Sequence, residues 1–292
     1  MLLITGAYGN VGRRIVPVMI QQGFDVKVFD ITPKVEEYMD MGAKAYAVGD
    51  GSIKEDMLKA VDGVDQILYI PPGGTFQETK IANNCVDAAV EKGVKQFVML
   101  SVIHPLLNTL YQHTMKLNAE RHLVYTGMKT GLNYTILQPT HYNHNIIVDD
   151  VLKTGEITCY SGDKKIHFVD AEDVALVAAK VLREGEKHRN ATYELCGPQE
   201  LTGQEVEDIF NRVAGTHVTT KYYTEKDMET IVGHGQMDSY NKELVYALQR
   251  TYNTWGFSGN GNVLEWLLGR PGTTLDEYFR KELKKLGKPV VG

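Results

Sequence analysis

The sequence predicts an α/β fold: a doubly wound parallel sheet with a smaller C-terminal α+β lobe. Apolar, β-branched runs alternate with helical patterns through the first half of the chain. A glycine-rich turn joins the first apolar run to the first helical pattern, and the strict alternation stops beyond residue 140. We therefore expect a sheet domain over residues 1–140, to which the chain returns at about 157–195, and a lobe formed mainly by residues 141–292.

The first half alternates strands with helices. We expect strands at 2–5, 25–30, 44–48, 66–70, 96–100 and 133–137, and helices near 11–22, 53–61, 79–92 and 111–126. Each strand–helix–strand unit has a length at which a right-handed crossover gives parallel strands. The run 97–100 is apolar throughout, which is typical of strands buried on both faces.

The second half has a different organisation. Short strands are expected at 156–160 and 192–195, and a helix over 169–184 that is opened by Asp170 or Asp173. Thr202 and Glu205 have the spacing of a capping box for a helix that reaches residue 214. From residue 225 the chain is predicted to be mostly helical, with glycine-rich breaks at 256–261 and 269–272.

The composition excludes several classes of protein. Of the 292 residues, 43% are hydrophobic and 23% charged, which does not favour disorder, and no apolar stretch is long enough for a membrane span. A net charge of −6 argues against an electrostatic nucleic-acid binder. The three scattered cysteines favour a reducing compartment. The first residues lead directly into a predicted strand, so we expect no signal peptide. We expect a cytoplasmic monomer or homodimer.

The glycine-rich turn has the pattern of a dinucleotide-binding loop. Gly6, Gly9 and Gly12 stand three residues apart, between a strand and a helix. The first allows a tight turn, the second lets a pyrophosphate approach the backbone, and the third lets the helix pack on the sheet. The helix N-terminus then offers main-chain amides to the phosphates. The predicted cofactor loop is Gly6, Ala7, Tyr8, Gly9, Asn10, Val11 and Gly12.

Further cofactor contacts are expected where strands end. Asp30 lies 18 residues after Gly12, where an acid accepts the ribose hydroxyls and repels a 2′-phosphate. We therefore expect NAD(H) to be preferred; because Lys34 follows closely, NADP(H) stays possible. The turn after the third strand would border the adenine, and the turn after the fourth would pass the ribose, although both could be plain turns. These positions are Asp50, Gly51, Ile70, Pro71 and Pro72.

Four segments resemble the atypical short-chain dehydrogenase/reductases, and most closely their NmrA-like group. Residues 5–12 are similar to the TGAxGxxG signature, and 93–101 to the strand that ends in an active-site serine, here Ser101. Residues 134–139 resemble the "YTILRP" strand and turn that border the nicotinamide, which implies cofactor contacts at Gln138, Pro139 and Thr140. Residues 168–175 match a further common segment. The resemblance covers roughly residues 1–215.

The helix that should carry the catalytic pair departs from the family pattern. Such reductases carry Tyr-x-x-x-Lys; here the lysine is Lys116, and Gln112 stands four residues before it. Tyr111 would lie about 140° away around a helix and could reach the site only if the helix starts after it, whereas His113 would lie about 60° away. Lys116 would hold the nicotinamide ribose and assist proton transfer, with Tyr111 or His113 as donor. Ser101 would donate a hydrogen bond to the substrate oxygen.

Several histidines are expected to line the substrate pocket. His104 follows Ser101, and His141, Tyr142 and His144 follow Pro139 in a loop. The spacing of His141 and His144 alone does not make a metal site, because no carboxylate or third histidine accompanies them. We expect no metal.

The leading functional prediction is an NAD(P)-dependent oxidoreductase that acts on a small carbonyl, enone or quinone-like compound. The resemblance and the displaced tyrosine also allow a non-catalytic NAD(P) redox sensor of the NmrA type. A third possibility is an epimerase, lyase or isomerase that uses the cofactor internally.

Overall fold

The structure, a computed structural model, describes residues 1–224, 227 and 238–291. The chain forms two compact units. Unit 1 consists of residues 1–108, 112–139 and 174–194, and unit 2 of residues 109–111, 140–173 and 195–292. The expected division at residue 140, with a return of the chain at about 157–195, stays a prediction. The assignment of separate cofactor and substrate roles to the two units stays a prediction.

Unit 1 is built on a seven-stranded sheet with strand order β10-β6-β5-β4-β1-β2-β3. All the neighbouring pairs among β1 to β6 are parallel. The chain reverses its direction of strand addition at β1, so the carboxyl ends of β1 and β4 flank the switch point, where ligands bind in such sheets. The strands are β1 (Leu2–Thr5), β2 (Val26–Asp30), β3 (Ala45–Val48), β4 (Gln66–Tyr69), β5 (Gln96–Leu100), β6 (Asn133–Pro139) and β10 (Ala191–Leu195).

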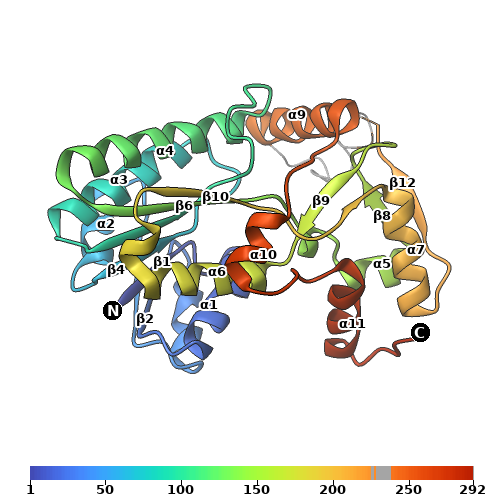
Figure 1. Cartoon of the computed structure of the whole chain (residues 1–292), viewed down its shortest axis with the longest axis horizontal. Helices are drawn as coiled ribbons and strands as arrows, with labels where there is room; N and C mark the ends of the chain where they lie inside the picture. Colours follow the sequence, from blue (N-terminus) through green and yellow to red (C-terminus); the bar gives the residue numbers. More distant parts are fainter. Residues whose placement is uncertain (225–226, 228–237, 292) are drawn as a thin grey trace. The chain divides into compact units, whose positions relative to one another are not determined.

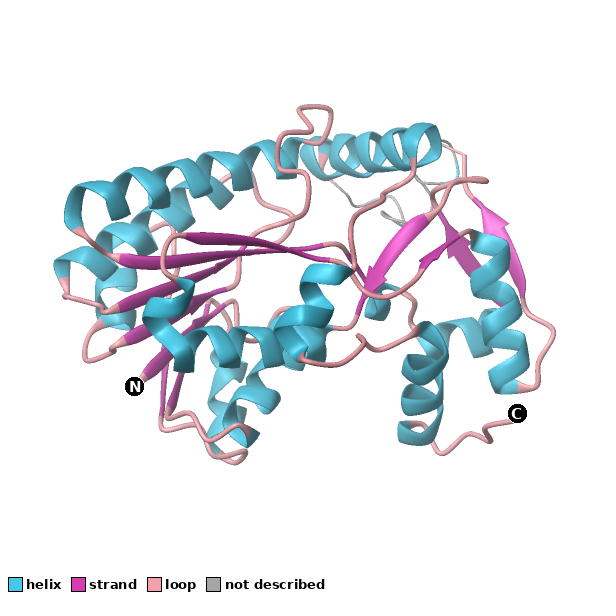
Figure 2. Ribbon diagram, viewed as in Figure 1, coloured by secondary structure: helices cyan, strands magenta, loops and turns pink. Residues whose placement is uncertain are grey.

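Helices cover both faces of this sheet, which confirms the predicted doubly wound architecture. α2 (Lys54–Val61), α3 (Glu78–Glu91) and α4 (Tyr111–Thr130) lie on one face, and α1 (Gly12–Gln21) and α6 (Ala171–Glu184) on the other (Figures 1 and 2). Two 3₁₀ turns, η1 (Pro33–Met39) and η3 (Gly185–His188), complete the unit. α4 packs so tightly on β6 that a Cβ at Gly127 would lie 2.5 Å from the Tyr134 ring. This contact places the buried face of α4 directly over β6.

The described residues of unit 2 form two small sheets and several helices. Its three-stranded sheet has the order β11-β9-β7, and β12 pairs in parallel with β8. α7 begins with the predicted capping box, since Thr202 and Glu205 exchange hydrogen bonds of 3.2 and 2.7 Å. The elements are β7 (His141–Tyr142), η2 (Asn143–Asn145), α5 (Val148–Thr154), β8 (Glu156–Cys159), β9 (Ile166–Val169), β11 (Glu200–Leu201), α7 (Gly203–Ala214), β12 (Thr219–Tyr222), α9 (Ser239–Trp255), α10 (Asn262–Leu268) and α11 (Leu275–Lys285).

The helical character predicted for the tail is confirmed in its described part. α9, α10 and α11 are separated at the two predicted glycine-rich breaks. The part of the prediction that concerns residues 225–226 and 228–237 lies outside the described residues.

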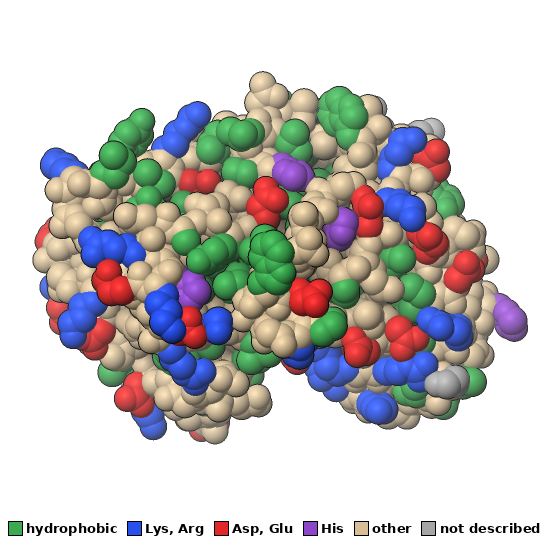
Figure 3. Space-filling model, in the orientation of Figure 1, with side chains coloured by type: hydrophobic (Ala, Val, Ile, Leu, Met, Phe, Trp, Pro, Cys, Tyr) green, Lys and Arg blue, Asp and Glu red, His purple; other side chains and the backbone are tan. Residues whose placement is uncertain are grey.

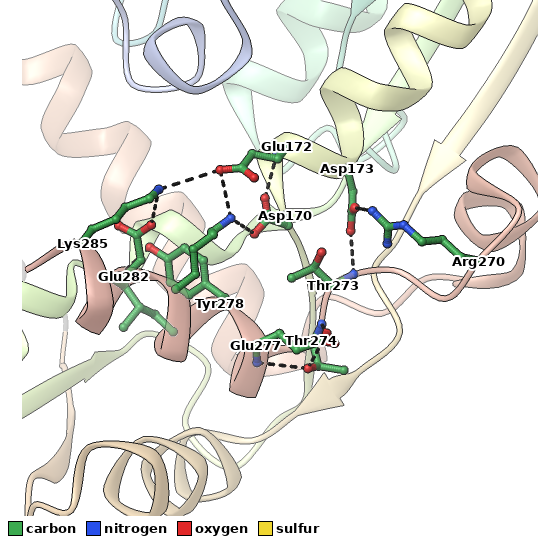
Figure 4. A network of polar contacts seen from close by, with 12 residues as sticks. Asp170, Glu172, Asp173, Arg270, Thr273, Thr274, Glu277, Tyr278, Glu282 and Lys285 are labelled. Carbon is green, nitrogen blue, oxygen red and sulfur yellow. Dashed lines mark hydrogen bonds and ion pairs between the residues drawn. The ribbon is translucent and has the colours of Figure 1, made fainter. Parts of the chain in front are cut away.

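The acidic start of α6 anchors the C-terminal segment within unit 2 (Figure 4). Asp170 caps the helix, because its Oδ1 accepts from the Glu172 amide at 2.7 Å, and its Oδ2 accepts from Lys281 Nζ at 3.1 Å. Asp173 is 1% exposed and binds Arg270 Nη2 and the Thr273 amide, each at 2.6 Å. The two aspartates therefore have different roles. Asp170 caps the N-terminus of α6, whereas Asp173 binds the segment between α10 and α11.

Polar and reactive side chains are distributed in a simple way over the molecule. Cys85, Cys159 and Cys196 are all buried. Basic and acidic side chains are interspersed on the face drawn in Figure 3, in keeping with the small net charge. No helix in the described part of the chain is both long and apolar enough to cross a membrane.

Candidate functional site

The glycine-rich loop lies in unit 1 between β1 and α1, as predicted. Gly6 has a φ of +56°, and a Cβ there would lie 2.8 Å from the Ile70 carbonyl oxygen. A Cβ at Gly12 would lie 2.2 Å from the Gly6 oxygen, so this glycine allows the helix to start against the turn. Thr5 Oγ1 and the Ile70 backbone exchange hydrogen bonds of 3.2 and 2.9 Å. The loop is therefore fixed to the end of β4.

Gly9 differs from the other two glycines. The nearest heavy atom to a Cβ at Gly9 is the Gly6 oxygen at 3.3 Å, so the protein itself nearly tolerates a side chain there. No side chain caps the N-terminus of α1. An uncapped helix start beside a bare backbone is the arrangement that receives a pyrophosphate, so these residues fit the phosphates of a dinucleotide.

Asp30 is held at the end of β2 by main-chain amides. Its Oδ2 accepts from the Tyr8 amide at 2.9 Å, and its Oδ1 accepts from the Thr32 amide at 3.3 Å. Two cations flank the neighbouring Tyr8 ring, with Arg13 at 5.4 Å and Lys34 at 6.0 Å from its centroid. The region that would meet an adenosine ribose thus carries the fixed Asp30 carboxylate and two cationic side chains, and Glu37 accepts from the Tyr8 hydroxyl at 2.8 Å.

The other predicted cofactor positions lie at the ends of β3, β4 and β6. Asp50 Oδ1 accepts from the Ser52 amide at 2.8 Å, so this carboxylate shapes its own turn, and the Gly51 carbonyl accepts from Asn84 at 3.0 Å. Ile70 is buried after β4, whereas Pro71 and Pro72 are partly exposed. Gln138 and Pro139 end β6 and are buried, and Thr140, in unit 2, bonds to the carbonyls of Leu195 and His167.

Lys116 forms an ion pair that the sequence did not predict. Its Nζ lies 2.6 Å from Glu78 Oε1, and the side chains are 16% and 3% exposed. Glu78 is the first residue of α3, where the helix dipole favours a carboxylate. Burial raises the pKa of Glu78, and the Lys116 charge opposes this shift. Thr79 Oγ1 donates to the Met115 carbonyl at 2.9 Å, which fixes α3 to α4 beside the pair.

The two candidate proton donors occupy contrasting places. α4 begins at Tyr111, which is 51% exposed, so Tyr111 belongs to the helix and does not share the face of Lys116. His113 is buried, and its Nδ1 lies 3.0 Å from the His104 carbonyl. Since a carbonyl only accepts, Nδ1 carries the proton. Burial lowers the pKa of His113 to about 4, so its ring is neutral near pH 7.

The His104 loop bends sharply after β5. His104 has a φ of +53°, an uncommon conformation for a residue other than glycine. The Ser101 amide donates to the Leu137 carbonyl at 2.8 Å and the Ile103 amide to the Pro139 carbonyl at 3.0 Å, so the loop continues along β6. His113 thus supports the bend from α4.

A buried polar cluster lies where β5 and β6 end. Ser101 is 5% exposed, and its hydroxyl makes no hydrogen bond to any residue that the structure describes. Glu120, one helical turn after Lys116, is 8% exposed and accepts from Gln138 Nε2 at 2.9 Å. Burial raises the pKa of Glu120, and the neighbouring Ser101 and Gln138 side chains offset this shift only in part. The sequence analysis missed Glu120, although its spacing from Lys116 places both on one helix face.

The predicted substrate-pocket residues of unit 2 form an aromatic group. The His141 ring lies edge-on to Phe168 and Tyr252, with centroids 5.5 and 5.9 Å away. Burial lowers the pKa of His141 to about 4 and raises that of Tyr142. Tyr142 stacks on His144 at 4.8 Å. Within the described residues, no group of three or more His, Cys, Asp or Glu side chains could hold a metal ion.

Comparisons with known proteins identify the family. The NmrA-like family matches residues 1–288, so the likeness extends through the tail beyond the expected limit near residue 215. The chain is 24% identical over 294 residues to an NAD(P)H azoreductase of Xenophilus azovorans, covering 98% of this chain and 99% of the relative. It is 23% identical over 287 residues to quinone oxidoreductase 2 of Escherichia coli K12, covering 95% and 96%.

Solved structures show the same fold. The Escherichia coli NADPH-dependent quinone oxidoreductase complexed with NADPH superposes with a TM-score of 0.80 at 23% identity, covering 96% of this chain and 99% of the other. The Citrobacter triphenylmethane reductase complexed with NADP(H) gives a TM-score of 0.82 at 22% identity, covering 97% and 100%.

Proposed function

The chain belongs to the NmrA-like family, and from this premise we propose that it is an NAD(P)H-dependent reductase of small conjugated acceptors, with quinones as the leading substrate class. Two full-length relatives are named as an azoreductase and a quinone oxidoreductase, and both names describe reduction of a conjugated acceptor. The glycine loop and Asp30 of this chain fit the dinucleotide that such a reaction needs. The bound cofactor supplies the hydride.

The choice of substrate class rests on helix α4, which has no tyrosine on the face that carries Lys116. Gln112 stands one turn before Lys116, and Tyr111 is on another side of α4. A simple ketone becomes a basic alkoxide on reduction and needs a strong proton donor. A quinone becomes a hydroquinone anion, whose charge is delocalised over the ring, so hydrogen-bond donors suffice to stabilise it. We assign this role to Ser101, and the assignment is supported by its buried hydroxyl, which has no hydrogen-bond partner among the described residues.

Lys116 acts from its pair with Glu78. The paired ammonium is fixed in one position, where it can bond the nicotinamide ribose and contribute positive charge near the reduced oxygen. His113 is a poor acid because its ring is neutral, and we assign it to the support of the His104 bend. The expected roles of His104, and of His141, Tyr142 and His144 in unit 2, in substrate binding stay predictions.

The loop is proposed to accept both NAD(H) and NADP(H). Asp30 favours the unphosphorylated ribose, as the sequence predicts, because a 2′-phosphate would meet its carboxylate. Arg13 and Lys34 lie close by and would attract that phosphate. The names of one relative and one solved structure refer to NAD(P)H and NADPH, which supports acceptance of both forms, and we infer that Asp30, Arg13 and Lys34 together set the preference.

The second candidate is an NmrA-type redox sensor, which binds the nucleotide without turnover. Gln112 in place of a proton donor is the observation that supports it. A structure of mutant NmrA also shares the fold, with a TM-score of 0.75 at 16% identity. The two candidates differ in one property: only the reductase oxidises NAD(P)H when an acceptor is added.

Two measurements test the proposal. Fluorescence titration with NADH and NADPH measures binding, and absorbance then follows nucleotide oxidation with quinones, azo dyes and simple ketones. We expect binding, turnover of quinones and dyes, and no turnover of ketones. Lys116→Ala should lower kcat far more than it weakens nucleotide binding, whereas Lys129→Ala, in the last turn of the same helix, should change neither. Binding without turnover of any acceptor would establish the sensor instead.

A further inference from the structure

We propose that Glu120 is the proton store of the reductase and that it delivers its proton to the reduced acceptor through the Ser101 hydroxyl. The inference rests on the proposed function and names a group that the family resemblance did not supply. It follows from the geometry of three buried side chains, Ser101, Glu120 and Gln138.

The position of the cluster is the first argument. Ser101 follows β5 directly, and Gln138 is the penultimate residue of β6, the neighbouring parallel strand. Both stand at the carboxyl edge of the sheet, where ligands of such folds bind. Glu120 reaches this edge from α4, on the same helix face as Lys116. The cluster therefore lies beside the lysine that is proposed to act on the cofactor and acceptor.

The hydrogen bonding of the cluster is the second argument. Gln138 Nε2 donates to Glu120 at 2.9 Å, so the amide orients the carboxyl. Ser101 is 5% exposed, yet its hydroxyl has no hydrogen-bond partner within the described residues. Its main-chain amide donates to the Leu137 carbonyl at 2.8 Å, so Ser101 lies beside Gln138, the residue that binds the Glu120 carboxyl. A buried hydroxyl without a fixed hydrogen-bond partner can rotate, so it can bond first to the neighbouring carboxyl and then to the oxygen of a bound acceptor.

The charge around Glu120 is the third argument. On α4 the nearby cation, Lys116, is paired with Glu78 of α3. From β5 and β6 the facing groups are Ser101 and Gln138, and neither is ionisable in the relevant range. Burial therefore governs this carboxyl and raises its pKa. A carboxyl with a raised pKa holds a proton at a higher pH than an exposed one, which is what a proton store requires.

The proton balance of the step is complete. Hydride transfer would add one hydrogen and two electrons to the acceptor, which becomes an anion with its negative charge on an oxygen and needs one further proton. That oxygen takes the proton of the Ser101 hydroxyl while Ser101 Oγ takes the proton of Glu120, so Glu120 becomes a carboxylate. Solvent returns one proton to Glu120 before the next cycle. Ser101 ends each cycle unchanged.

The main test is Glu120→Gln, which keeps the size of the side chain and its contact with Gln138. We expect kcat for a quinone to fall by roughly 10- to 100-fold and to lose the decrease that wild type shows as the pH rises through the ionisation of Glu120. Ser101→Ala should cause a similar loss, and the double variant should be no slower than the slower single one, because both act in one path. Losses that multiply in the double variant contradict the relay.

The control variant is His122→Gln, also on α4, which removes the imidazole that contacts Asp87 of α3 at 2.7 Å. It should leave kcat and its pH dependence unchanged. If Glu120→Gln does not fold, Gln138→Met tests the same path. Removing the amide raises the pKa of Glu120 further, so the decrease of kcat should move to higher pH. An unmoved profile contradicts the inference.

Infrared spectroscopy gives a readout that does not depend on turnover. At a pH just above the range in which exposed glutamates ionise, the wild type should show the carbonyl band of a buried, protonated carboxyl, and Glu120→Gln should lack it. Without this band in wild type, Glu120 is ionised and cannot be the store. A wild type that binds nucleotide but reduces no acceptor overturns the proposed function and the relay together. An active wild type matched by an equally active Glu120→Gln overturns the relay alone.

Discussion

Replacing Gly9 with alanine should weaken nucleotide binding and leave the free energy of unfolding almost unchanged. The new Cβ would meet only the Gly6 carbonyl oxygen, at 3.3 Å, so a shift of a few tenths of an ångström accommodates it. We expect the free energy of unfolding to change by about 1 kcal/mol or less. The methyl group would, however, stand where a pyrophosphate has to approach the backbone.

The expected loss of affinity follows from the amides that the methyl group would separate from a phosphate. A hydrogen bond to a charged group contributes about 1.5–3 kcal/mol, so losing one such bond weakens binding by roughly 10- to 100-fold. Gly12→Ala is the contrasting variant, because its Cβ would lie 2.2 Å from the Gly6 oxygen and 2.5 Å from the Ala7 oxygen. Backbone must then move, so stability and binding should fall together.

Calorimetric titration with NADH and NADPH measures the affinity, and urea unfolding measures the stability. Gly9→Ala should lose affinity for both nucleotides while its unfolding midpoint stays near that of wild type. If Gly9→Ala binds both nucleotides as tightly as wild type does, no phosphate lies against this residue, and the placement of the cofactor is wrong.

Three further predictions concern single side chains. Asp30→Ser should weaken NADH and relatively favour NADPH in a fluorescence titration; an unchanged ratio would show that Asp30 does not meet the ribose. Burial lowers the pKa of His113 to about 4, against about 6.5 in the unfolded chain. The unfolded state therefore takes up a proton first, and the free energy of unfolding of wild type should decrease as the pH falls from 6.5 toward 4. In urea unfolding, the decrease between pH 7 and 5 should be about 1–2 kcal/mol smaller for His113→Gln. Asp173→Ala should cost about 2–4 kcal/mol because it leaves two donors without their acceptor, whereas Arg270→Ala should cost less, about 1–2 kcal/mol, because the Thr273 amide still donates to the buried Asp173 carboxylate. Equal losses in chemical denaturation would contradict the assignment of Asp173 as the anchor.

The fold of unit 1 was predictable because local patterns specify it. The strand expected at 96–100 is observed with those limits, since an apolar run between a glycine and a serine leaves little choice. The helix expected over 111–126 continues to Thr130, one turn further, where Gly131 with a φ of +80° ends it. The glycine loop was predictable for the same reason: its strand, turn and helix are adjacent in sequence.

The interactions that define the site were predictable only in part. Lys116 was identified from a family pattern, but its partner Glu78 lies on another helix, and only the packing of α3 against α4 brings them together. The acids at the start of α6 have the sequence signature of a helix cap. That interpretation holds for Asp170 but not for Asp173, whose partners follow about a hundred residues later. Long-range ion pairs leave no local pattern, so sequence periodicity cannot show them.

The burial of all three thiols has a consequence for the proposed reduction of quinones. Quinones are electrophiles that arylate thiolates, and a thiol is attacked only when it ionises and is accessible. Cys85 and Cys196 are fully buried and Cys159 is 8% exposed, and burial raises the pKa of Cys85. Such a protein would tolerate repeated contact with its own reactive substrates. It would also accept a single engineered surface cysteine as a selective point of attachment for a spectroscopic label.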